Sequence, residues 1–396
     1  MRILFCTDTY PPQVNGVSVV TALSAAGLTE RGWECSVVAP RYPRALERRS
    51  ADLRKKIPVT GVPSVPLPRY PEIRVALSST VVADAIERAR PDIVHCATEF
   101  IIGRAGLRAA ARRGIPVCTS YHTDFTKYMR SYGVPWLAGV ATRSVTNFHR
   151  RSERVFTPSR YAADGLATSG LADIEVWGRG VDDVLFDPAR RSAVLRRALG
   201  LGDAFTFLFV GRLAPEKEVD VVLDAFSRVE AAMPTASVRL LLAGAGPSMD
   251  SLKRRASPAV TFLGSLDRET QLPALYASAD AFVMASTTET LGLVALEAMA
   301  SGAPVIASAV GGVADYLRDG ENGLSFAPRD AAECAGAMLR LCRDEALRMR
   351  LGRGARKTAQ SRSWEQELDR LDVSYREVLE RRRGPASGLS QRPPAA

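Results

Sequence analysis

Short apolar runs alternate with helix-forming stretches along almost the whole chain of 396 residues. This alternation is typical of a parallel α/β sheet, in which a helix returns the chain to the starting edge after each strand. The predicted strands form two series: 2–8, 34–40, 92–98, 115–122, 154–159 and 174–178, then 206–212, 238–244, 260–265, 281–286, 304–308 and 322–328. The predicted helices include 18–31, 78–90, 103–113, 219–231, 248–255, 269–278, 291–300 and 331–343.

The two series predict two doubly wound, Rossmann-like α/β domains, each with its own core. A linker at 181–192 separates an N-terminal domain, 1–185, from a C-terminal domain, 186–363. In open α/β sheets, ligands bind outside the carboxyl ends of the strands. We therefore expect two domains that face each other across a cleft lined by those strand ends.

Three further segments stand apart from the alternation. The insertion 41–74 is rich in proline and basic residues, and we expect a long loop there with one short helix at most. A helix at 364–380 ends the ordered chain. The Arg-, Pro-, Gly- and Ser-rich stretch 381–396 is predicted to be disordered.

The composition fits an ordinary globular protein, with 46% apolar and 24% charged residues. No apolar run approaches the ~20 residues that a membrane span requires, and the N-terminus lacks the longer apolar region of a secretory signal. The six cysteines are scattered without a CxxC pair, which favours free thiols in a reducing compartment over disulfides or a zinc site. These features predict a cytoplasmic protein.

The net charge of +10 is unevenly distributed. Residues 1–185 carry 25 Lys and Arg against 17 Asp and Glu, whereas the remainder carries 28 against 26. A basic N-terminal half suggests an anionic partner, such as an acidic membrane surface at the inner face of the membrane or a phosphorylated acceptor. An arginine-rich solvated surface is the plain alternative. Nucleic acid is not expected, because the chain lacks interleaved aromatic residues and any recognised nucleic-acid module.

Two glutamates, Glu289 and Glu297, lie on either side of Gly292 in the segment 287–308. The predicted helix 291–300 places Glu289 in the loop before its N-terminus and Glu297 about two turns into it. A helix N-terminus attracts an anion such as a pyrophosphate, and the two carboxylates suit sugar and ribose hydroxyls. Two solvated surface acids are the alternative. The apolar neighbours of Glu297 argue against it, since a charge buried there needs a partner.

Two cations, Arg212 and Lys217, follow a predicted strand and precede a helix, which is a suitable arrangement for a pyrophosphate clamp. The alternative is a surface ion pair between Arg212 and a neighbouring glutamate, Glu216 or Glu218.

Gly244 and Gly246 follow the next strand. The third glycine of a dinucleotide fingerprint would fall at Met249, and no acidic residue ends the following strand to hold a ribose. The two glycines then indicate a turn that lets a nucleotide approach the backbone, or a turn with a purely structural role.

In the N-terminal half, Asn15 and Gly16 follow the first strand and precede a helix that offers a second anion site, for the donor phosphate or the acceptor. Asn15 is expected to tolerate a left-handed backbone conformation. His122 ends another strand beside Asp124, at the carboxyl edge of the sheet. A lone histidine is more often packed than functional, but this position favours a functional role. The other two histidines are expected to be structural or on the surface.

Several of these motifs together resemble those of glycosyltransferase family 4. TTETLGLVALEAM resembles the family's pattern of two glutamates separated by seven residues, although Leu291 replaces the usual aromatic residue. GRLAPEK is similar to the family's GRL-xx-EKG pattern, with Glu218 where glycine is usual. PPQVNGV resembles its PPxxGG loop, with Asn15 in place of the first glycine. WGRGVD, SYHTD and VGRLAPEK are most similar to the branch that contains GDP-mannose-dependent α-mannosyltransferases and plant-type sulfoquinovosyltransferases.

The resemblance implies a two-domain GT-B fold whose final helix crosses back to the N-terminal domain. It implies catalytic roles for Arg212, Lys217, His122 and Glu289, with His122 near C6 of the donor sugar. Donor-binding roles are implied for Gly16, Gly211, Gly244, Gly246, Thr290, Leu291, Gly292, Leu293 and Glu297. Roles in acceptor binding or local support fall to Asn15, Asp124, Arg179 and Asp182.

The implied reaction moves a hexose, with retention, from a nucleotide-sugar to a hydroxyl of a sugar, polyol or lipid-linked acceptor, with mannose from GDP-mannose expected first. No cofactor or metal is expected, because no DxD motif is present to bridge a metal to the diphosphate. A UDP-sugar donor for glucosyl or sulfoquinovosyl transfer is the alternative. Three other classes fit less well. A phosphorylase would need a lysine for a pyridoxal cofactor and a much longer chain, and a sugar-nucleotide epimerase would need additional acid/base residues in the cleft. A two-domain binding protein without chemistry is usually exported, and no signal segment is recognised.

Overall fold

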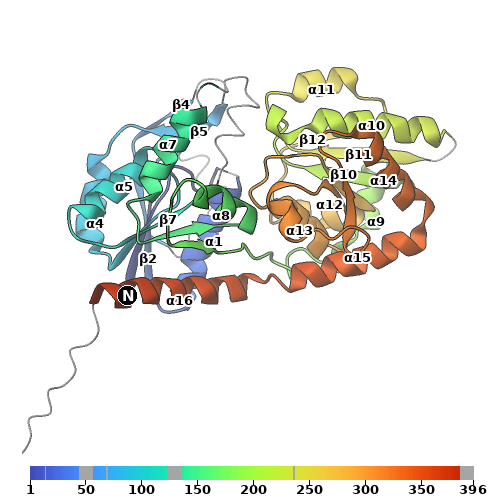
Figure 1. Ribbon diagram of the computed structural model, residues 1–396. Coiled ribbons are helices and arrows are strands. Elements are labelled where there is room, and N and C mark those ends of the chain that lie inside the picture. Colours follow the sequence, from blue (N-terminus) through green and yellow to red (C-terminus); the bar gives the residue numbers. More distant parts are fainter. Residues whose placement is uncertain are drawn as a thin grey trace, which may run out of the picture.

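The computed structural model describes residues 1–13, 15–43, 57–67, 70–122, 136, 138–234 and 237–383. Two lobes lie side by side, each built on a parallel sheet with helices on both faces (Figure 1). Among the described residues, seven strands form the sheet of the first lobe in the order β3-β2-β1-β6-β7-β8-β9. Six strands form the sheet of the second lobe in the order β12-β11-β10-β13-β14-β15. The predicted pair of doubly wound sheets is confirmed.

The sheet of the first lobe contains β1 (Arg2–Cys6), β2 (Glu34–Pro40), β3 (Val59–Val62), β6 (Ile93–Cys96), β7 (Val117–Ser120), β8 (Arg154–Thr157) and β9 (Ile174–Val176). The sheet of the second lobe contains β10 (Phe205–Val210), β11 (Val238–Ala243), β12 (Val260–Gly264), β13 (Ala281–Met284), β14 (Val305–Ser308) and β15 (Gly323–Phe326). Every strand of the two predicted series is present. Most end one or two residues earlier than predicted, because the small and polar residues that close each apolar run already belong to the following loop.

The helices of the first lobe are α1 (Gly16–Glu30), α4 (Thr80–Ala89), α5 (Ile101–Ala111), α7 (Ala138–His149) and α8 (Arg160–Ala167). Those of the second lobe are α9 (Ala193–Ala198), α10 (Val219–Ala232), α11 (Met249–Arg255), α12 (Leu272–Ser278), α13 (Leu293–Ala300), α14 (Ala331–Arg343) and α15 (Glu345–Gln360). Short 3₁₀ turns lie at η3 (Pro188–Arg190), η4 (Pro215–Lys217) and η5 (Gly311–Asp315). Of these helices, α7, α8, α9 and α15 add to the predicted ones.

The insertion 41–74 is not the long loop that its composition predicts. Its described part contains β3, which extends the first sheet, and a separate antiparallel pair, β4 (Ser64–Leu67) and β5 (Tyr70–Ala76). Prolines within β4 and β5 and on either side of β3 obscured these strands, because a proline cannot donate to the ladder and is tolerated mainly at sheet edges. Residues 44–56 and 68–69 lie outside the described residues, and the described part of the insertion contains no helix.

The last helix, α16 (Trp364–Arg383), crosses from the end of α15 to the first lobe and runs along its lower edge in Figure 1. Its residues Leu371, Tyr375, Val378 and Leu379 join the buried cluster that contains Trp33. The indole Nε1 of Trp33 donates to Asp372 at 2.6 Å. The expected crossing is therefore confirmed. The helix continues to Arg383, so the predicted disorder is wrong for residues 381–383, and 384–396 lie outside the described residues.

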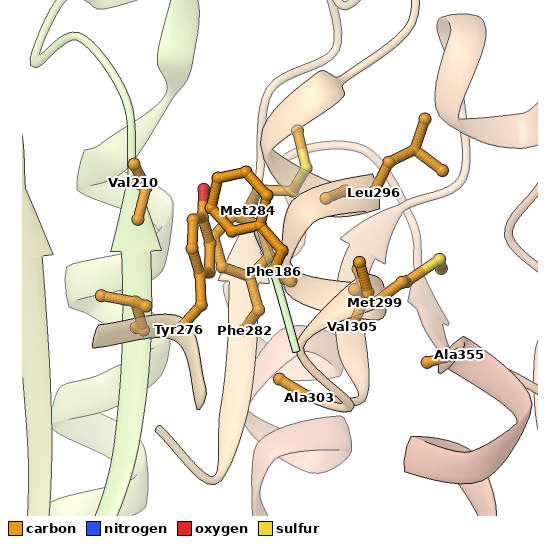
Figure 2. Packing of buried hydrophobic residues seen from close by; sticks show 14 of the residues in the cluster. Phe186, Val210, Tyr276, Phe282, Met284, Leu296, Met299, Ala303, Val305 and Ala355 are labelled. Carbon is orange, nitrogen blue, oxygen red and sulfur yellow. The ribbon is translucent and has the colours of Figure 1, made fainter. Parts of the chain in front are cut away.

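The linker packs on the second lobe. Phe186 is fully buried and packs with Tyr276, Phe282, Met284 and, from α13, Leu296 (Figure 2). Arg356 fastens the linker to α15 by donating to the carbonyl oxygen of Phe186 at 2.8 Å and by an ion pair with Asp187 at 2.7 Å. α13 contributes Leu296 and Met299 to this core, which therefore holds the helix in place. The domain boundary between residues 185 and 186 stays a prediction.

Candidate active site

The loop after β13 and the N-terminus of α13 form the centre of the candidate site. Gly292 precedes α13 in the left-handed conformation, with φ of 82°, and the first turn contains no acidic residue. No side chain caps this end among the described residues, so its N–H groups and positive dipole end are available to an anion. The helix begins at Leu293, not at the predicted Leu291, because Gly292 interrupts the helical backbone. Glu297 consequently lies about one turn into the helix, not two.

The turn η5 holds the loop that carries Glu289. The backbone N–H of Gly312 donates to the carbonyl oxygen of Glu289 at 2.8 Å. A Cβ atom at Gly312 would lie 2.1 Å from the carbonyl oxygen of Thr290, so only glycine permits this approach. The hydroxyl of Tyr316 donates to the carbonyl oxygen of Leu291 at 2.9 Å. Sequence reasoning missed these supports, although the Gly-Gly pair two residues after the predicted strand 304–308 was the available signal.

The two predicted cations flank this loop. Lys217 Nζ lies 2.5 Å from Glu289 Oε1, and both side chains are partly accessible. Arg212 pairs with Glu216 at 2.5 Å, as the alternative interpretation proposed, but Glu216 is fully buried and not on the surface. Ser286 donates to the carbonyl oxygen of Glu216 at 3.0 Å, which fastens η4 to the Glu289 loop. The structure thus brings Arg212, Lys217 and Glu289 together.

Glu218 adopts the left-handed conformation, with φ of 48°. This conformation explains why the family pattern has glycine at this position. The carboxylate of Glu218 accepts from Arg329 Nε at 2.7 Å and from Thr287 at 3.3 Å. The departure from the pattern leaves the shape of the loop intact.

Three predicted donor-binding glycines pack two neighbouring loops against each other. A Cβ atom at Gly244 would lie 1.8 Å from the carbonyl oxygen of Gly211, and one at Gly246 would lie 2.3 Å from that of Leu213. The backbone N–H of Leu213 donates to the carbonyl oxygen of Ala245 at 3.0 Å. These contacts match the structural alternative for this turn. Its part in donor binding stays a prediction.

Glu297 has the partner that its apolar surroundings require. Its side chain is buried, and Oε1 accepts from Arg268 Nε at 2.8 Å while Oε2 accepts from the hydroxyl of Tyr276 at 3.1 Å. Burial, and then the charge of Glu297, raise the pKa of Tyr276 well above its usual value, so this hydroxyl stays protonated and donates. Sequence reasoning did not identify Arg268, which comes from the loop after β12.

From the first lobe, His122 and Arg179 face the Glu289 loop. The hydroxyl of Thr290 donates to the carbonyl oxygen of His122 at 2.8 Å, a contact between the two lobes. A guanidinium nitrogen of Arg179 donates to His122 Nδ1. Burial, and then the charge of Arg179, lower the pKa of His122 well below 6.5. The ring is therefore neutral, and because Nδ1 accepts, Nε2 carries the proton.

Arg179 is 5% exposed, and its Nε has no hydrogen-bond partner among the described residues. Burial lowers the pKa of Arg179 to about 10, against the opposing effect of the Glu289 charge. A Cβ atom at Gly16 would lie 3.5 Å from a guanidinium nitrogen of Arg179. The N-terminus of α1 is thus beside Arg179 and His122.

Asn15 has an extended backbone, with φ of −156°, so the expected left-handed conformation is wrong. Its side chain instead caps α1 by accepting from the backbone N–H of Ser18 at 2.9 Å, and the helix begins at Gly16, two residues earlier than predicted. Asp182 accepts from the backbone N–H of Leu185 at 2.7 Å and so fixes the first turn of the linker. Asp124 lies outside the described residues.

The other histidines are structural, as predicted. His95 is buried between Tyr375 and Ser120, and His149 is buried beside Thr119. All six cysteines are free. The described part of the chain contains no group of three or more metal-ligating side chains. None of the described helices combines the length and the apolarity needed to cross a bilayer.

Two facing Rossmann-like lobes joined by a crossing helix, with two cations beside an uncapped helix N-terminus in the second lobe, define a GT-B glycosyltransferase. Comparison with known proteins identifies the family. The family profile described as "Glycosyltransferase Family 4" matches residues 14–185, and that described as "Glycosyl transferases group 1" matches residues 204–344. The chain belongs to glycosyltransferase family 4.

Among curated relatives, a GDP-mannose-dependent alpha-mannosyltransferase of Mycobacterium tuberculosis is 33% identical over 96% of this chain and 98% of its own length. The sulfoquinovosyl transferase SQD2 of Arabidopsis thaliana is 31% identical over 77% of this chain and 61% of its own. Among solved structures, Alr3699/HepE of Anabaena in complex with UDP and glucose superposes with a TM-score of 0.79 at 21% identity, covering 95% of this chain and all of that one. This last similarity concerns the fold.

Proposed function

We propose that the protein transfers mannose from GDP-mannose to an acceptor hydroxyl with retention of the anomeric configuration. The observation that carries the proposal is the group of Arg212, Lys217 and the uncapped N-terminus of α13 around Glu289. Relatives that bear this activity in their names match almost the full length of the chain at 33% identity, which favours this donor. A UDP-sugar donor is the second candidate, favoured by the similarity to the sulfoquinovosyl transferase.

The chemistry follows from the charges. Glycosyl transfer proceeds through an oxocarbenium-like transition state while negative charge develops on the departing diphosphate. Arg212, Lys217 and the N–H groups of α13 provide fixed positive charge for that leaving group. In the present structure Lys217 is paired with Glu289. Donor binding would move Lys217 to the diphosphate and release Glu289 to accept from sugar hydroxyls.

His122 contributes a neutral hydrogen-bond donor. Its Nδ1 accepts from Arg179, so the N–H at Nε2 is directed by the arginine and can donate to a hydroxyl oxygen of the sugar. Because the ring is not protonated near neutral pH, it adds no competing cation beside the sugar. Because Glu289 is paired with Lys217, we assign it to sugar binding and propose a front-side reaction in which the leaving phosphate accepts the proton of the acceptor hydroxyl.

We further propose that no metal is needed, since Arg212 and Lys217 supply the charge that a metal would bring to the diphosphate. The proposal predicts unchanged turnover in EDTA. A loss of activity in EDTA that Mg²⁺ or Mn²⁺ restores would contradict it.

We propose that the acceptor is presented at an anionic membrane surface. Exposed apolar side chains on the first lobe support this assignment: Trp136, Val140 and Phe100 are 76%, 64% and 53% exposed. They accompany the basic excess of residues 1–185. Apolar insertion combined with anionic lipid attraction holds peripheral proteins on membranes. Vesicle co-sedimentation tests this: binding to anionic but not neutral vesicles should weaken in Trp136→Ser. Equal binding by both proteins would exclude Trp136 from the contact, and no binding of the wild type to anionic vesicles would favour a soluble sugar or polyol acceptor.

Turnover tests the donor. The purified protein should release GDP from GDP-mannose in the presence of a lipid extract and leave UDP-glucose unchanged, and NMR of the product should show the α-anomer. Lys217→Ala and Glu289→Gln should each reduce turnover at least 100-fold, as expected when a group that stabilises the transition state is removed. If the protein were active only with UDP-sugars, the donor would be a UDP-sugar and the assignment of the site would stand. No turnover with any nucleotide-sugar would reject the proposal.

A further inference from the structure

A second pocket lies at the junction of the two lobes, away from the residues assigned to donor binding. Its volume is about 650 Å³, and it lies between the N-terminus of α8, the end of η5 and the first turns of α16. Its walls contain four arginines, namely Arg160, Arg318, Arg362 and Arg370. None of the residues that line it was assigned a catalytic or donor-binding role.

Positive charge predominates in this pocket. Two carboxylates line it, Asp315 and Glu367, against the four arginines. Of these four arginines, only Arg370 forms an ion pair with a carboxylate among the described residues, and its partner is Glu367 at 2.9 Å. The guanidinium of Arg318 donates to backbone carbonyl oxygens, and that of Arg362 lies 5.6 Å from the ring centre of Tyr316.

The carboxylate of Asp315 accepts from the backbone N–H of Arg160 at 2.6 Å, and within the described ranges the guanidinium of Arg160 forms no ion pair with it. Three of the arginines that line the cavity thus form no ion pair with a carboxylate in the described part of the chain. Guanidinium groups bind phosphate oxygens through paired, charge-assisted hydrogen bonds. The cavity therefore has the chemistry of a phosphate site.

A second observation points to hydroxyl groups beside the phosphate. Glu367 is 4% exposed, and while its Oε1 bonds Arg370, its Oε2 is buried without a hydrogen-bond partner among the described residues. A buried acceptor without a donor is costly, and native proteins usually satisfy it with protein, water or ligand. A ligand hydroxyl would satisfy it here.

We propose that this pocket binds a soluble phosphomonoester that carries hydroxyl groups, such as a sugar phosphate or a polyol phosphate. Arg160 and Arg318 bind the phosphate, and Glu367 accepts from a neighbouring hydroxyl. The ligand contacts the first lobe through Arg160, the second lobe through Arg318 and the crossing helix through Glu367. It therefore stabilises the arrangement of lobes seen in this structure, since a ligand that binds one arrangement favours that arrangement.

The pocket also has a physical connection to the donor site. Asp315 and Gly312 belong to the same turn, η5, and Gly312 holds the backbone of Glu289. A ligand that fixes η5 from the pocket side thus restrains the loop that carries Glu289. This connection makes the pocket an effector site and not a second donor site.

Calorimetric titration of the full-length protein tests the proposal. The measurement uses the double variant Arg212→Ala, Lys217→Ala, so that phosphate binding at the donor site does not contribute. Glucose 6-phosphate should bind, inorganic phosphate should bind more weakly, and glucose should not bind. Adding Arg160→Ala or Arg318→Ala should weaken glucose 6-phosphate binding about 10- to 100-fold, as expected for the loss of a charged hydrogen-bonded pair.

Arg353→Ala serves as the matched control, because Arg353 is an exposed arginine of α15 outside the pocket, and its substitution should leave the affinity unchanged. Arg160→Glu provides a second variant, and circular dichroism verifies that each variant is folded. Unchanged affinity for glucose 6-phosphate in Arg160→Ala and Arg160→Glu would overturn the proposal. It would also be overturned if the Arg212→Ala, Lys217→Ala variant, without any further substitution, bound no glucose 6-phosphate. Arginine-dependent binding of anionic vesicles without glucose 6-phosphate binding would also overturn it. These binding results do not depend on whether GDP-mannose is the donor.

Discussion

At the scale of single residues, the hydrogen bond from Arg179 to His122 gives the clearest expectation for pH dependence. Burial and the Arg179 charge hold the pKa of His122 well below 6.5. The unfolded chain has the ordinary histidine pKa of about 6.5 and so binds more protons between the two values. The contribution of His122 to stability is therefore favourable above pH 6.5 and is lost as the pH falls from there toward the folded pKa.

The same shift predicts the pH profile of activity. Wild-type kcat/KM should show no acidic limb with a midpoint near 6.5 from His122, because the ring is already neutral there. Arg179→Gln removes the neighbouring charge, so the pKa of His122 should rise and an acidic limb should move toward neutral pH. Arg179→Lys, which retains the charge, should keep the wild-type profile even if KM increases. A wild-type profile with a limb at 6.5 that is unchanged in Arg179→Gln would contradict this role.

Glu218 gives a prediction about strain. A non-glycine residue in the left-handed region costs on the order of 1 kcal/mol. Glu218→Gly relieves this cost, and the ion pair that it removes has a mostly exposed partner, Arg329. We expect thermal unfolding to show equal or higher stability for Glu218→Gly. The control Arg228→Gly, within the exposed face of α10, should cost about 1 kcal/mol. If Glu218→Gly lost as much stability as the control, the hydrogen bonds of the Glu218 carboxylate would contribute more to stability than its backbone strain costs.

Single residues also show the limits of sequence reasoning. Arg212, Lys217, Glu289 and Glu297 could be predicted because each lies in a motif that follows a strand and leads into a helix. Arg268 could not, since its contact with Glu297 depends on the packing of α12 against α13. The hydrogen bond between Arg179 and His122 is likewise a tertiary contact across 57 positions in sequence.

At the scale of elements, η5 determines where Glu289 lies. Gly312→Ala would place a Cβ atom 2.1 Å from the carbonyl oxygen of Thr290, so η5 or the Glu289 loop must move. We expect kcat/KM to fall at least 10-fold, because small displacements of positioning groups have large effects on rate. The midpoint of thermal unfolding should also decrease.

Gly336→Ala is the matched control for this change. Gly336 lies in α14 with nothing within 4 Å of an added Cβ atom, so the substitution should leave activity unchanged and stabilise the protein by about 0.5–1 kcal/mol. Wild-type activity in Gly312→Ala would mean that η5 does not position the loop.

The elements themselves were largely predictable, because apolar runs of strand length between helix-forming stretches recur through the chain. Their ends were less so. The start of α13 depends on the left-handed Gly292, and the start of α1 on the cap formed by Asn15, which the residue types allow but do not require. The strands β4 and β5 escaped prediction because their prolines resemble those of a loop, and β3 because it is short and flanked by Pro58 and Pro63.

At the scale of the whole molecule, α16 joins the end of the chain to the core of the first lobe. Tyr375 is fully buried and contacts Trp33 and His95. Tyr375→Ala should destabilise the protein by about 3–5 kcal/mol, in the range for removing a large buried aromatic ring. Val373→Ala changes an exposed residue of the same helix and should stay within about 0.5 kcal/mol of wild type. Chemical denaturation measures both, and equal effects would show that α16 packs only loosely on the first lobe.

The sequence motifs indicated that both halves contribute to one cleft, but not how the halves meet. That arrangement depends on contacts between distant segments, such as Thr290 with His122 and Arg160 with Asp315. No local pattern specifies these contacts, since each involves residue types that are common on any surface. The pocket at the lobe junction was unpredictable for the same reason.

The most direct test of the donor site is calorimetric titration of the purified protein with GDP in the presence of EDTA. We expect GDP to bind in a metal-independent manner, and more tightly than UDP or ADP. Lys217→Ala should weaken GDP binding at least 10-fold, because a charge-assisted contact to the diphosphate is removed. If GDP failed to bind, or bound equally to the wild type and Lys217→Ala, the assignment of this group as a nucleotide-sugar site would be wrong.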